Sequence, residues 1–421
     1  MKKTKRHFLK LFTLGLFSLP LIKGVKSSYK PKIVIIGGGF GGGTCAKYLE
    51  NFSDLFDVIL IEKKKYYYTC PFSNYVLGGL RTLEQNKFNY KKFEFRKTKF
   101  LNSKVLFINP DKNKIVLDNK DSIIYDWLII SPGIDFKWDK IEGYNQKVNE
   151  IFPHCWNGKD IDILNNKIDS LENNSVILIT APEYPYRCPP APYERASMIA
   201  HKLKKKNLKF KIFLLDNKNS FTKKDLFFEA WDKFYPNCIE WISKDGGGEV
   251  IQFDNRQKEI LTKSAGRFKG NLINIIPEQK AGKLIQDSGL NKNDWVDIDP
   301  ISFAHKDFSN IHVLGDSINA WDMPKSAFSA NSQAKICAEN LKNKILGKEM
   351  INPTFLNTCY SLAASQYGFS ISSWYRVNAK KSKIVSLGSS ETNTGMQNSI
   401  YKEEMMHSLG WYENITSEVF G

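Results

Sequence analysis

Two apolar runs near the start of the chain flank a stretch with a different periodicity. Residues 32–37, KIVIIG, and residues 58–61, VILI, are short and almost wholly apolar, which is typical of buried parallel strands. Between them, TCAKYLENF at 44–52 has the spacing of an amphipathic helix. The order strand, helix, strand predicts a βαβ unit with two neighbouring parallel strands.

The turn of this unit is rich in glycine and is followed by an acidic residue. Gly37, Gly39 and Gly42 fit the spacing G-x-G-x-x-G, and Glu62 ends the second strand. Glycines let the backbone approach a pyrophosphate at a helix N-terminus, and a carboxylate at this place can hold ribose hydroxyls. A glycine-rich turn without a ligand is the alternative, but the strand–turn–helix–strand context favours dinucleotide binding.

Two later apolar strands complete a pattern. Residues 125–130 lead into a small-residue turn with Gly133, and residues 311–314 lead into a glycine and Asp316. Together with the first unit, they are typical of flavoproteins with two dinucleotide-binding domains. We expect Asp316 to bond the ribityl chain of FAD, unless it merely ends a strand. We expect a helix from about Ser329, with its N-terminus directed at the flavin.

A second α/β segment lies between these marks. Its predicted strands cover 175–180 and 211–215, and its turn reads PEYPYRCPP at 182–190. In NAD(P)H-using relatives of such flavoproteins, glycines stand here. Proline lacks the N–H group that would cradle a pyrophosphate. We therefore expect no NAD(P)H at this turn, and electrons from another donor.

The predicted fold class is α/β. It is a two-dinucleotide-binding-domain, Rossmann-like flavoprotein of the disulfide reductase type with a C-terminal interface domain. The last segment is aromatic, lacks a dinucleotide pattern and has no obvious amphipathic basic helix pair. Residues 386–399 are predicted to form a loop. The predicted divisions are a signal peptide at 1–28, the FAD-binding domain at 29–142 and 283–349, the second nucleotide-type domain at 143–282, and the C-terminal domain at 350–421.

The N-terminus has a basic start and an apolar run at 11–22, too short to span a bilayer. This is typical of a signal peptide. TKRHFLK at 4–10 resembles a twin-arginine export signal with a lysine in place of the first arginine. We expect a periplasmic protein without stable membrane insertion; an uncleaved N-terminal anchor is the alternative.

The net charge says little about the partners of this protein. The net charge is +17, with 61 Lys and Arg against 44 Asp and Glu, but only eight of the basic residues are Arg. Readers of nucleic acid rely on the bidentate contacts of Arg. The scattered lysines favour a solvated surface, so we expect no nucleic acid, while an acidic protein partner stays open.

Seven cysteines leave at least one thiol unpaired. None is followed by x-x-Cys-His, so we expect no c-type haem on this chain, and none has the spacing of a zinc site. Cys45 and Cys337 lie in predicted helices and are expected in the core.

Several motifs together resemble one family, the flavoprotein subunit of flavocytochrome c sulfide dehydrogenase. The likeness covers nearly the whole chain after the predicted signal. Sulfide:quinone oxidoreductases are more distant kin. The motifs are YYTC with SNYVLGG at 67–79, KIEGY at 140–144, RCPPAPYERAS at 187–197, AGK at 281–283, VLGD with MPKSAFSANSQAK at 313–335, FLNTCYS at 355–361, YRVNA at 375–379, and WYENI at 411–415.

The resemblance implies roles for individual residues. Cys188 and Cys359 match a redox-active pair that forms a disulfide beside the flavin. Cys70 matches the cysteine that binds FAD through a thioether. Glu194 is a candidate general base, or else a carboxylate that complements a helix dipole. Arg187 and Arg195 either favour anionic sulfur or are solvated at the surface.

The implied activity is FAD-dependent oxidation of sulfide to sulfur or polysulfide, with electrons passed to a separate c-type cytochrome subunit that carries the haem. Two alternatives stay open. A sulfide:quinone oxidoreductase would need a membrane-docking element, which the tail does not display. A flavin electron-transfer subunit without sulfide activity would not need both Cys188 and Cys359.

Overall fold

The computed structural model describes residues 29–93, 95–156 and 158–421. The predicted export signal lies outside the described residues. Residues 31–421 form one compact unit, to which the following description applies.

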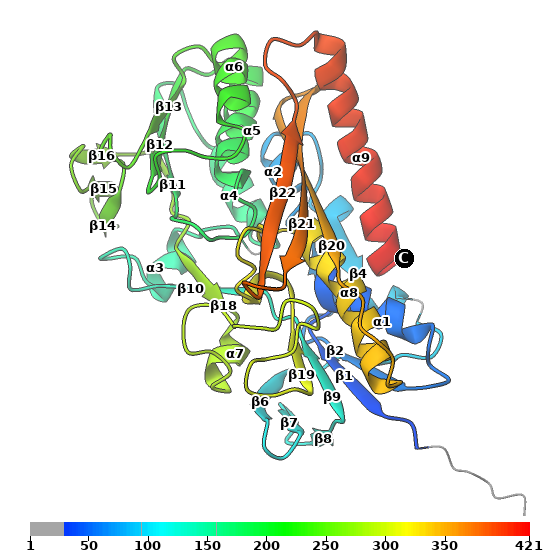
Figure 1. The fold of residues 1–421 in the computed structure, drawn as a ribbon. Coiled ribbons are helices and arrows are strands. Elements are labelled where there is room, and N and C mark those ends of the chain that lie inside the picture. Colours follow the sequence, from blue (N-terminus) through cyan, green and yellow to red (C-terminus); the bar gives the residue numbers. More distant parts are fainter. Residues whose placement is uncertain (1–28, 94, 157) are drawn as a thin grey trace, which may run out of the picture. The chain divides into compact units, whose positions relative to one another are not determined.

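The first lobe is built on a parallel sheet with the strand order β19-β9-β1-β2-β5 (Figure 1). The predicted βαβ unit and both later strands are confirmed. Helix α1 begins at Phe40, inside the glycine turn, instead of at Thr44, and α8 begins at Ala327 instead of about Ser329. The two helices pack against each other. The elements are β1 (Lys32–Ile36), α1 (Phe40–Glu50), β2 (Asp57–Ile61), β5 (Lys99–Leu101), β9 (Trp127–Ile130), β19 (Ile311–Val313) and α8 (Ala327–Ile345).

The second lobe contains another parallel sheet, with the order β13-β12-β11-β17. Both predicted strands exist, each longer by one or two residues than expected. The proline-rich turn joins β11 to α5, and Pro190 is the N-cap of that helix. The elements are α4 (Ile161–Asp169), β11 (Ser175–Ala181), α5 (Ala191–Lys205), β12 (Phe210–Asp216), α6 (Lys224–Phe234), β13 (Ile239–Ile242) and β17 (Leu272–Asn274).

Smaller antiparallel elements lie along the chain between the strands of these sheets. They are the pair β3 (Tyr66–Tyr68) with β4 (Lys87–Asn89), the meander β6 (Val105–Asn109), β7 (Lys114–Leu117) and β8 (Ser122–Ile124), the pair β10 (Ile134–Phe136) with β18 (Gln279–Ala281), and the meander β14 (Val250–Asp254), β15 (Glu259–Thr262) and β16 (Arg267–Lys269). The short helices are α2 (Ser73–Leu77), α3 (Gln146–Ile151) and α7 (Lys283–Asp287), with 3₁₀ turns at Glu84–Asn86, Tyr90–Lys92 and Gly315–Ser317.

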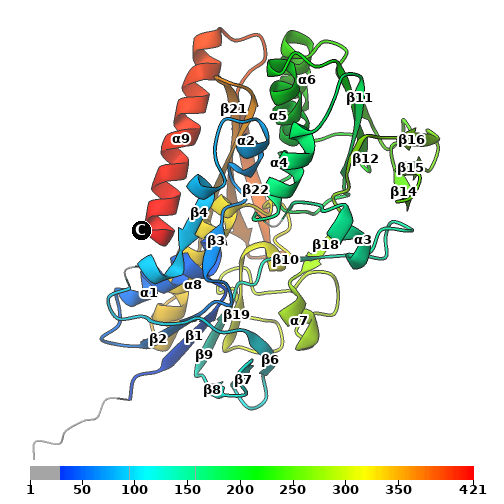
Figure 2. The ribbon, with the colours of Figure 1, turned by 180° about the vertical axis from the view of Figure 1, so that it is seen from behind.

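The C-terminal segment forms an antiparallel sheet, β20 (Thr354–Ala364), β21 (Tyr367–Asn378) and β22 (Lys383–Glu391), followed by α9 (Asn398–Phe420). The predicted loop at 386–399 is wrong at both ends, because 386–391 belong to β22 and 398–399 to α9. Main-chain pairing with β21 overrides the low strand propensity of serine and glycine. In both views the sheet lies between α5 and α6 on one side and α9 on the other (Figures 1 and 2).

Each lobe has its own buried apolar cluster. The cluster of the first lobe includes Cys45 and Cys337, which confirms their predicted place in the core. The cluster of the second lobe continues into β20, β21 and α9. Within the described part of the chain, no helix is both long and apolar enough to cross a membrane.

Candidate flavin and sulfur site

A cavity of about 910 Å³ begins at the C-terminal ends of β1 and β2 and reaches the second lobe and β20. Most residues predicted to bind the cofactor line it. They are Gly37, Gly39, Glu62, Cys70, Gly133 and Asp316. Gly42 and Ser329 are not among its lining residues.

Gly42 acts behind the cavity by letting α1 pack close to the turn. A Cβ atom at this position would lie 1.9 Å from the carbonyl oxygen of Gly37. Gly37 has a φ of +96°, and its Cβ would lie 2.3 Å from the carbonyl oxygen of Ser131. Both glycines are therefore required by the backbone itself, and the close turn leaves room for a ligand next to α1.

Glu62 directly follows β2, at the rim of the cavity. One carboxylate oxygen accepts from the Gly38 N–H at 2.9 Å, and the other from the Lys64 N–H at 2.9 Å. These bonds orient the side chain between the glycine turn and the loop after β2. This is the position expected for a carboxylate that holds a ribose.

Asp316 is the best evidence that a flavin fits here. Its Oδ1 is buried and has no hydrogen-bond partner among the residues described. Burial raises the pKa of Asp316, whereas Arg187 and Lys325 lower it. A buried carboxylate oxygen that lacks a donor suits a ligand hydroxyl, such as one on the ribityl chain of FAD.

The N-terminus of α8 also meets the cavity, through Ser326, Ala327 and Phe328. Ser326 caps the helix by accepting from the Ser329 N–H at 2.9 Å. The Ser329 hydroxyl instead donates to Asn357 at 3.2 Å, away from the cavity lining. The expected helix end is therefore present, but residues 326–328 form it in place of Ser329.

Three cysteines that are distant in sequence line the same cavity. Cys70 follows β3, Cys188 precedes α5, and Cys359 lies on β20. All three are free thiols. A hydrogen bond with Cys188 lowers the pKa of Cys70 to about 7, although burial opposes the shift, and Arg187 lowers it as well. Burial raises the pKa of Cys359, and Lys223 partly offsets that effect.

The backbone around Cys188 is held in an unusual conformation. Cys188 has a φ of +59°, in the left-handed region that costs a non-glycine residue roughly 1–3 kcal/mol. Its N–H donates to the Lys325 carbonyl at 2.8 Å, and its carbonyl accepts from the Ala191 N–H at 2.9 Å. Main-chain hydrogen bonds thus fix the turn on both sides of the thiol.

Glu194 lies in the first turn of α5 with both oxygens engaged. One accepts from the Leu362 N–H at 3.0 Å and the other from Asn74 Nδ2 at 2.8 Å. Burial raises its pKa, and these two bonds offset part of that effect. Glu194 joins α5 to α2 and β20 at the cavity wall. Its assignment as a general base stays a prediction.

The two arginines differ. Arg195 is 1 % exposed. Its guanidinium donates to the carbonyls of His154 at 2.9 Å and Cys155 at 2.8 Å, and to the Asn274 side chain at 2.7 Å, and so joins three segments of the second lobe. Solvation at the surface is wrong for this residue. Arg187 lines the cavity, and its buried Nε finds no acceptor in the described chain.

Two lysines that contact site residues, without lining the cavity themselves, were not predicted from the sequence. Lys223 Nζ donates to the Cys359 carbonyl at 2.7 Å and to Ser361 at 2.8 Å. Lys325 Nζ donates to the carbonyls of Asp316 at 2.9 Å and Ile318 at 2.6 Å, and burial lowers its pKa to about 7. Lys325 stands in the quoted MPKS string, whereas nothing in the sequence distinguishes Lys223 from the other lysines.

Three family models match parts of the chain; the first two overlap at 161–177, and none of the three covers 278–350. The pyridine nucleotide-disulphide oxidoreductase model covers 31–177. The central model of the sulfide dehydrogenase [flavocytochrome c] flavoprotein chain covers 161–277, and the flavocytochrome c sulphide dehydrogenase flavin-binding model covers 351–420. The potential metal ligands of the described residues form no cluster of three or more.

Similar proteins include a mitochondrial sulfide:quinone oxidoreductase of Dictyostelium discoideum, 25 % identical over 81 % of this chain and 78 % of the relative. The flavoprotein chain of sulfide dehydrogenase [flavocytochrome c] of Chlorobaculum thiosulfatiphilum is 49 % identical over 45 residues, 11 % of this chain and 94 % of the relative. The solved sulfide:quinone oxidoreductase of Aquifex aeolicus shares the fold, with a TM-score of 0.70, 17 % identity and coverage of 92 % of both chains.

The predicted fold class is confirmed by the first family model and by this structural neighbour. Together with the cavity and its cysteines, these matches support a sulfide-oxidising flavoprotein, similar both to sulfide:quinone oxidoreductases and to the flavoprotein chain of flavocytochrome c sulfide dehydrogenase.

Proposed function

We propose that this chain is the flavoprotein subunit of a periplasmic sulfide:cytochrome c oxidoreductase. The observation that carries the proposal is the meeting of Cys188 and Cys359 with Cys70 in one cavity that also holds the glycine turn and Asp316. The two family models of flavocytochrome c flavoprotein chains support it.

In this proposal, Cys188 and Cys359 form the disulfide that sulfide attacks. Hydrosulfide adds to one sulfur as a persulfide, and the S–S bond breaks to release the other cysteine as a thiolate. Arg187 favours these anions, because its guanidinium carries a buried donor without an acceptor in the described chain. FAD, when bound, supplies the two-electron acceptor beside the thiolate.

We further propose that Cys70 holds FAD through a thioether. Besides the hydrogen bond with Cys188, Arg187 lowers the pKa of the Cys70 thiol and so favours the thiolate that a nucleophilic cysteine needs. Acid precipitation tests this directly: flavin absorbance should stay in the pellet of the wild-type protein and leave the pellet of Cys70→Ser. Flavin released equally from both proteins would contradict the thioether.

Replacement of the sulfur pair tests the activity. Cys188→Ser and Cys359→Ser should each abolish bleaching of the flavin by sulfide, because neither variant can form the disulfide. The matched control is Cys238→Ser, since Cys238 is a half-buried thiol outside the cavity. Bleaching at the wild-type rate in either site variant would disprove the role of the pair.

The electron acceptor needs a separate test. We propose a c-type cytochrome subunit that carries the haem, and an exported flavoprotein would meet it in the periplasm. A quinone is the second candidate, favoured by the similarity to sulfide:quinone oxidoreductase over 81 % of the chain. Sulfide should drive reduction of the co-purified cytochrome but not of a soluble ubiquinone analogue; the reverse result would establish the quinone activity.

A further inference from the structure

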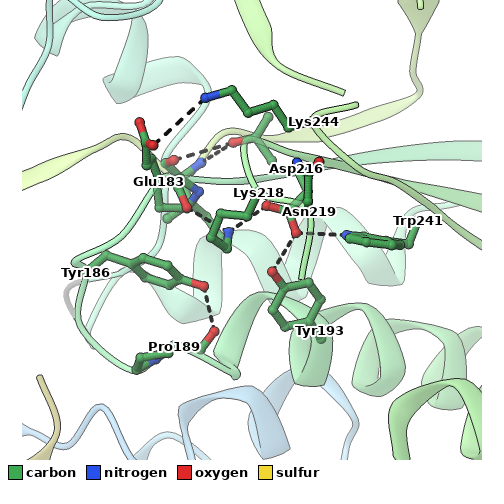
Figure 3. A network of polar contacts seen from close by, with 12 residues as sticks. Glu183, Tyr186, Pro189, Tyr193, Asp216, Lys218, Asn219, Trp241 and Lys244 are labelled. Carbon is green, nitrogen blue, oxygen red and sulfur yellow. Dashed lines mark hydrogen bonds and ion pairs between the residues drawn. The ribbon is translucent and has the colours of Figure 1, made fainter. Parts of the chain in front are cut away.

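The second lobe has an acidic residue where the first lobe has Glu62, but it is used differently. Asp216 ends β12, opposite Ala181 at the end of β11. Its side chain is fully buried. One oxygen accepts from the Tyr193 hydroxyl at 2.6 Å and from Trp241 Nε1 at 2.8 Å, and the other from Lys218 Nζ at 2.5 Å (Figure 3). Both carboxylate oxygens of Asp216 thus accept hydrogen bonds from side chains of the protein, whereas the Glu62 carboxylate lines the cavity.

Lys218 is the cation of this network. Its ammonium group also donates to the Pro182 carbonyl at 2.7 Å, at the start of the proline-rich turn. The same group lies 5.0 Å from the ring centre of Tyr186 and 5.3 Å from that of Tyr184. Cation–π attraction at these distances draws the turn towards the lysine.

The turn leads from these contacts to the redox cysteine. The Tyr186 hydroxyl donates to the Pro189 carbonyl at 2.6 Å, so that a bond closes across Cys188 (Figure 3). Lys218 therefore holds the start of the turn through its hydrogen bond to Pro182. Tyr186, which packs beside Lys218, holds the end of the turn through its hydrogen bond to Pro189, on the far side of Cys188. Tyr193, bonded to the same Asp216, lies on the helix that follows the turn.

A buried ion pair is a poor source of stability, because desolvation of both charges offsets their attraction. Such a pair can instead fix the positions of the groups that it joins. Cys188 has its backbone in the left-handed region, and its thiol hydrogen-bonds Cys70 in the structure. Under the proposed function, its sulfur must also reach the sulfur of Cys359 on another segment, which requires a fixed turn.

We propose that Asp216 and Lys218, with Tyr186, form a positioning network that holds the Cys188 sulfur where it can bond Cys359. This inference rests on the proposed function, which requires that disulfide. Loosening the network lowers the effective concentration of one thiol at the other, and therefore weakens the disulfide without removing either cysteine.

The test is a glutathione redox titration of the flavin-loaded protein. Two cysteine thiols and one oxidised glutathione exchange to give the Cys188–Cys359 disulfide and two reduced glutathiones, and peptide mass spectrometry counts the linked peptides. Lys218→Gln should lower the equilibrium constant for the disulfide by about tenfold, which moves the midpoint by about 30 mV towards more oxidising buffer.

The matched control is Lys244→Gln. Lys244 approaches Glu183 of the same turn at 3.9 Å, but these side chains are 39 % and 55 % exposed (Figure 3). Screened surface pairs contribute little, so its midpoint should match the wild type. Equal midpoints for Lys218→Gln and Lys244→Gln would overturn the proposal.

Tyr186→Phe is the milder second variant, in case Lys218→Gln does not fold. It removes only the hydroxyl that bonds Pro189 and should weaken the disulfide by about threefold. An unchanged midpoint in a folded Tyr186→Phe protein would also contradict the network. A wild-type protein that forms no Cys188–Cys359 disulfide in any buffer would instead remove the basis in the proposed function.

Discussion

The two lobes repeat one topology and use its turn in opposite ways. In each, a strand, a turn and a helix lead to a parallel strand with an acidic end, at Glu62 in one and Asp216 in the other. The glycine turn of the first lobe opens onto the cavity. The proline-rich turn of the second is held by its own side chains and delivers Cys188 to that cavity. One βαβ framework can therefore serve as a ligand cradle or as a thiol support.

The difference follows from the residues in the turns. Glycine at 37 and 42 allows backbone contacts that a side chain would prevent, and it leaves N–H groups for a ligand. Prolines at 189, 190 and 192 remove such donors at the start of α5. The absence of NAD(P)H binding stays a prediction, for which the buried bonds of Asp216 add a second reason.

The largest effect is expected from Gly42→Ala. The new Cβ would lie 1.9 Å from a backbone oxygen that cannot move without shifting β1 or α1. We expect a loss of about 3 kcal/mol or more of stability and nearly complete loss of flavin, measured by thermal unfolding and by flavin content. Gly410→Ala in α9 is the control, since a Cβ there meets no atom within 4 Å. It should bind flavin normally; flavin in both variants would mean that the tight glycine turn is not required.

Asp316→Asn should have the next largest effect, and it should act on binding and stability in opposite directions. In a Cys70→Ser background, which prevents a thioether from masking affinity, flavin should bind about 10- to 100-fold more weakly, as expected for the loss of a charged hydrogen-bond partner. Fluorescence titration with FAD measures this. Unchanged affinity would remove Asp316 from the flavin site.

The stability of the flavin-free protein should show the opposite sign. Burial raises the pKa of Asp316 in the folded chain, so the folded state keeps a proton that the unfolded state has already lost. Stability therefore falls as pH rises from the ordinary aspartate range through the raised pKa. Asn does not titrate, so Asp316→Asn should unfold at a higher temperature than its parent at pH 7, and this advantage should vanish below the ordinary aspartate pKa.

Patterns within one short stretch were enough to predict several central strands of both lobes, although other elements, such as β5, β13 and β17, were not predicted. The apolar runs at 32–37 and 175–180 are strands in the structure, because buried parallel strands need nothing more than a continuous apolar run. Strand β22 was missed, because its serines and glycine have no strand pattern of their own and depend on pairing with β21. Helix α9 was also not predicted.

Site residues could be predicted where a short motif fixes their place relative to a strand end. Gly37, Glu62 and Asp316 follow from strand ends. The meeting of Cys70, Cys188 and Cys359 follows from no spacing, and only the family resemblance brought these residues together. The roles of Lys218 and Lys223 arise from burial, which is a property of the folded chain and leaves no sign in a sequence with many lysines.

The smallest effect is expected from Glu62→Gln, and it tests the comparison at the acidic strand ends. Glu62 is only half-buried and already accepts two backbone N–H groups, which Gln can still partly satisfy. Loss of the charge should weaken flavin binding by about 1 kcal/mol, or roughly fivefold, in the Cys70→Ser background. Fluorescence titration again gives the affinity. Glu183→Gln, an exposed acid in the turn of the second lobe, is the control and should leave affinity unchanged. If Glu62→Gln binds flavin as its parent does, the carboxylate braces only the turn of the first lobe, and both lobes then use their acidic strand end for structure.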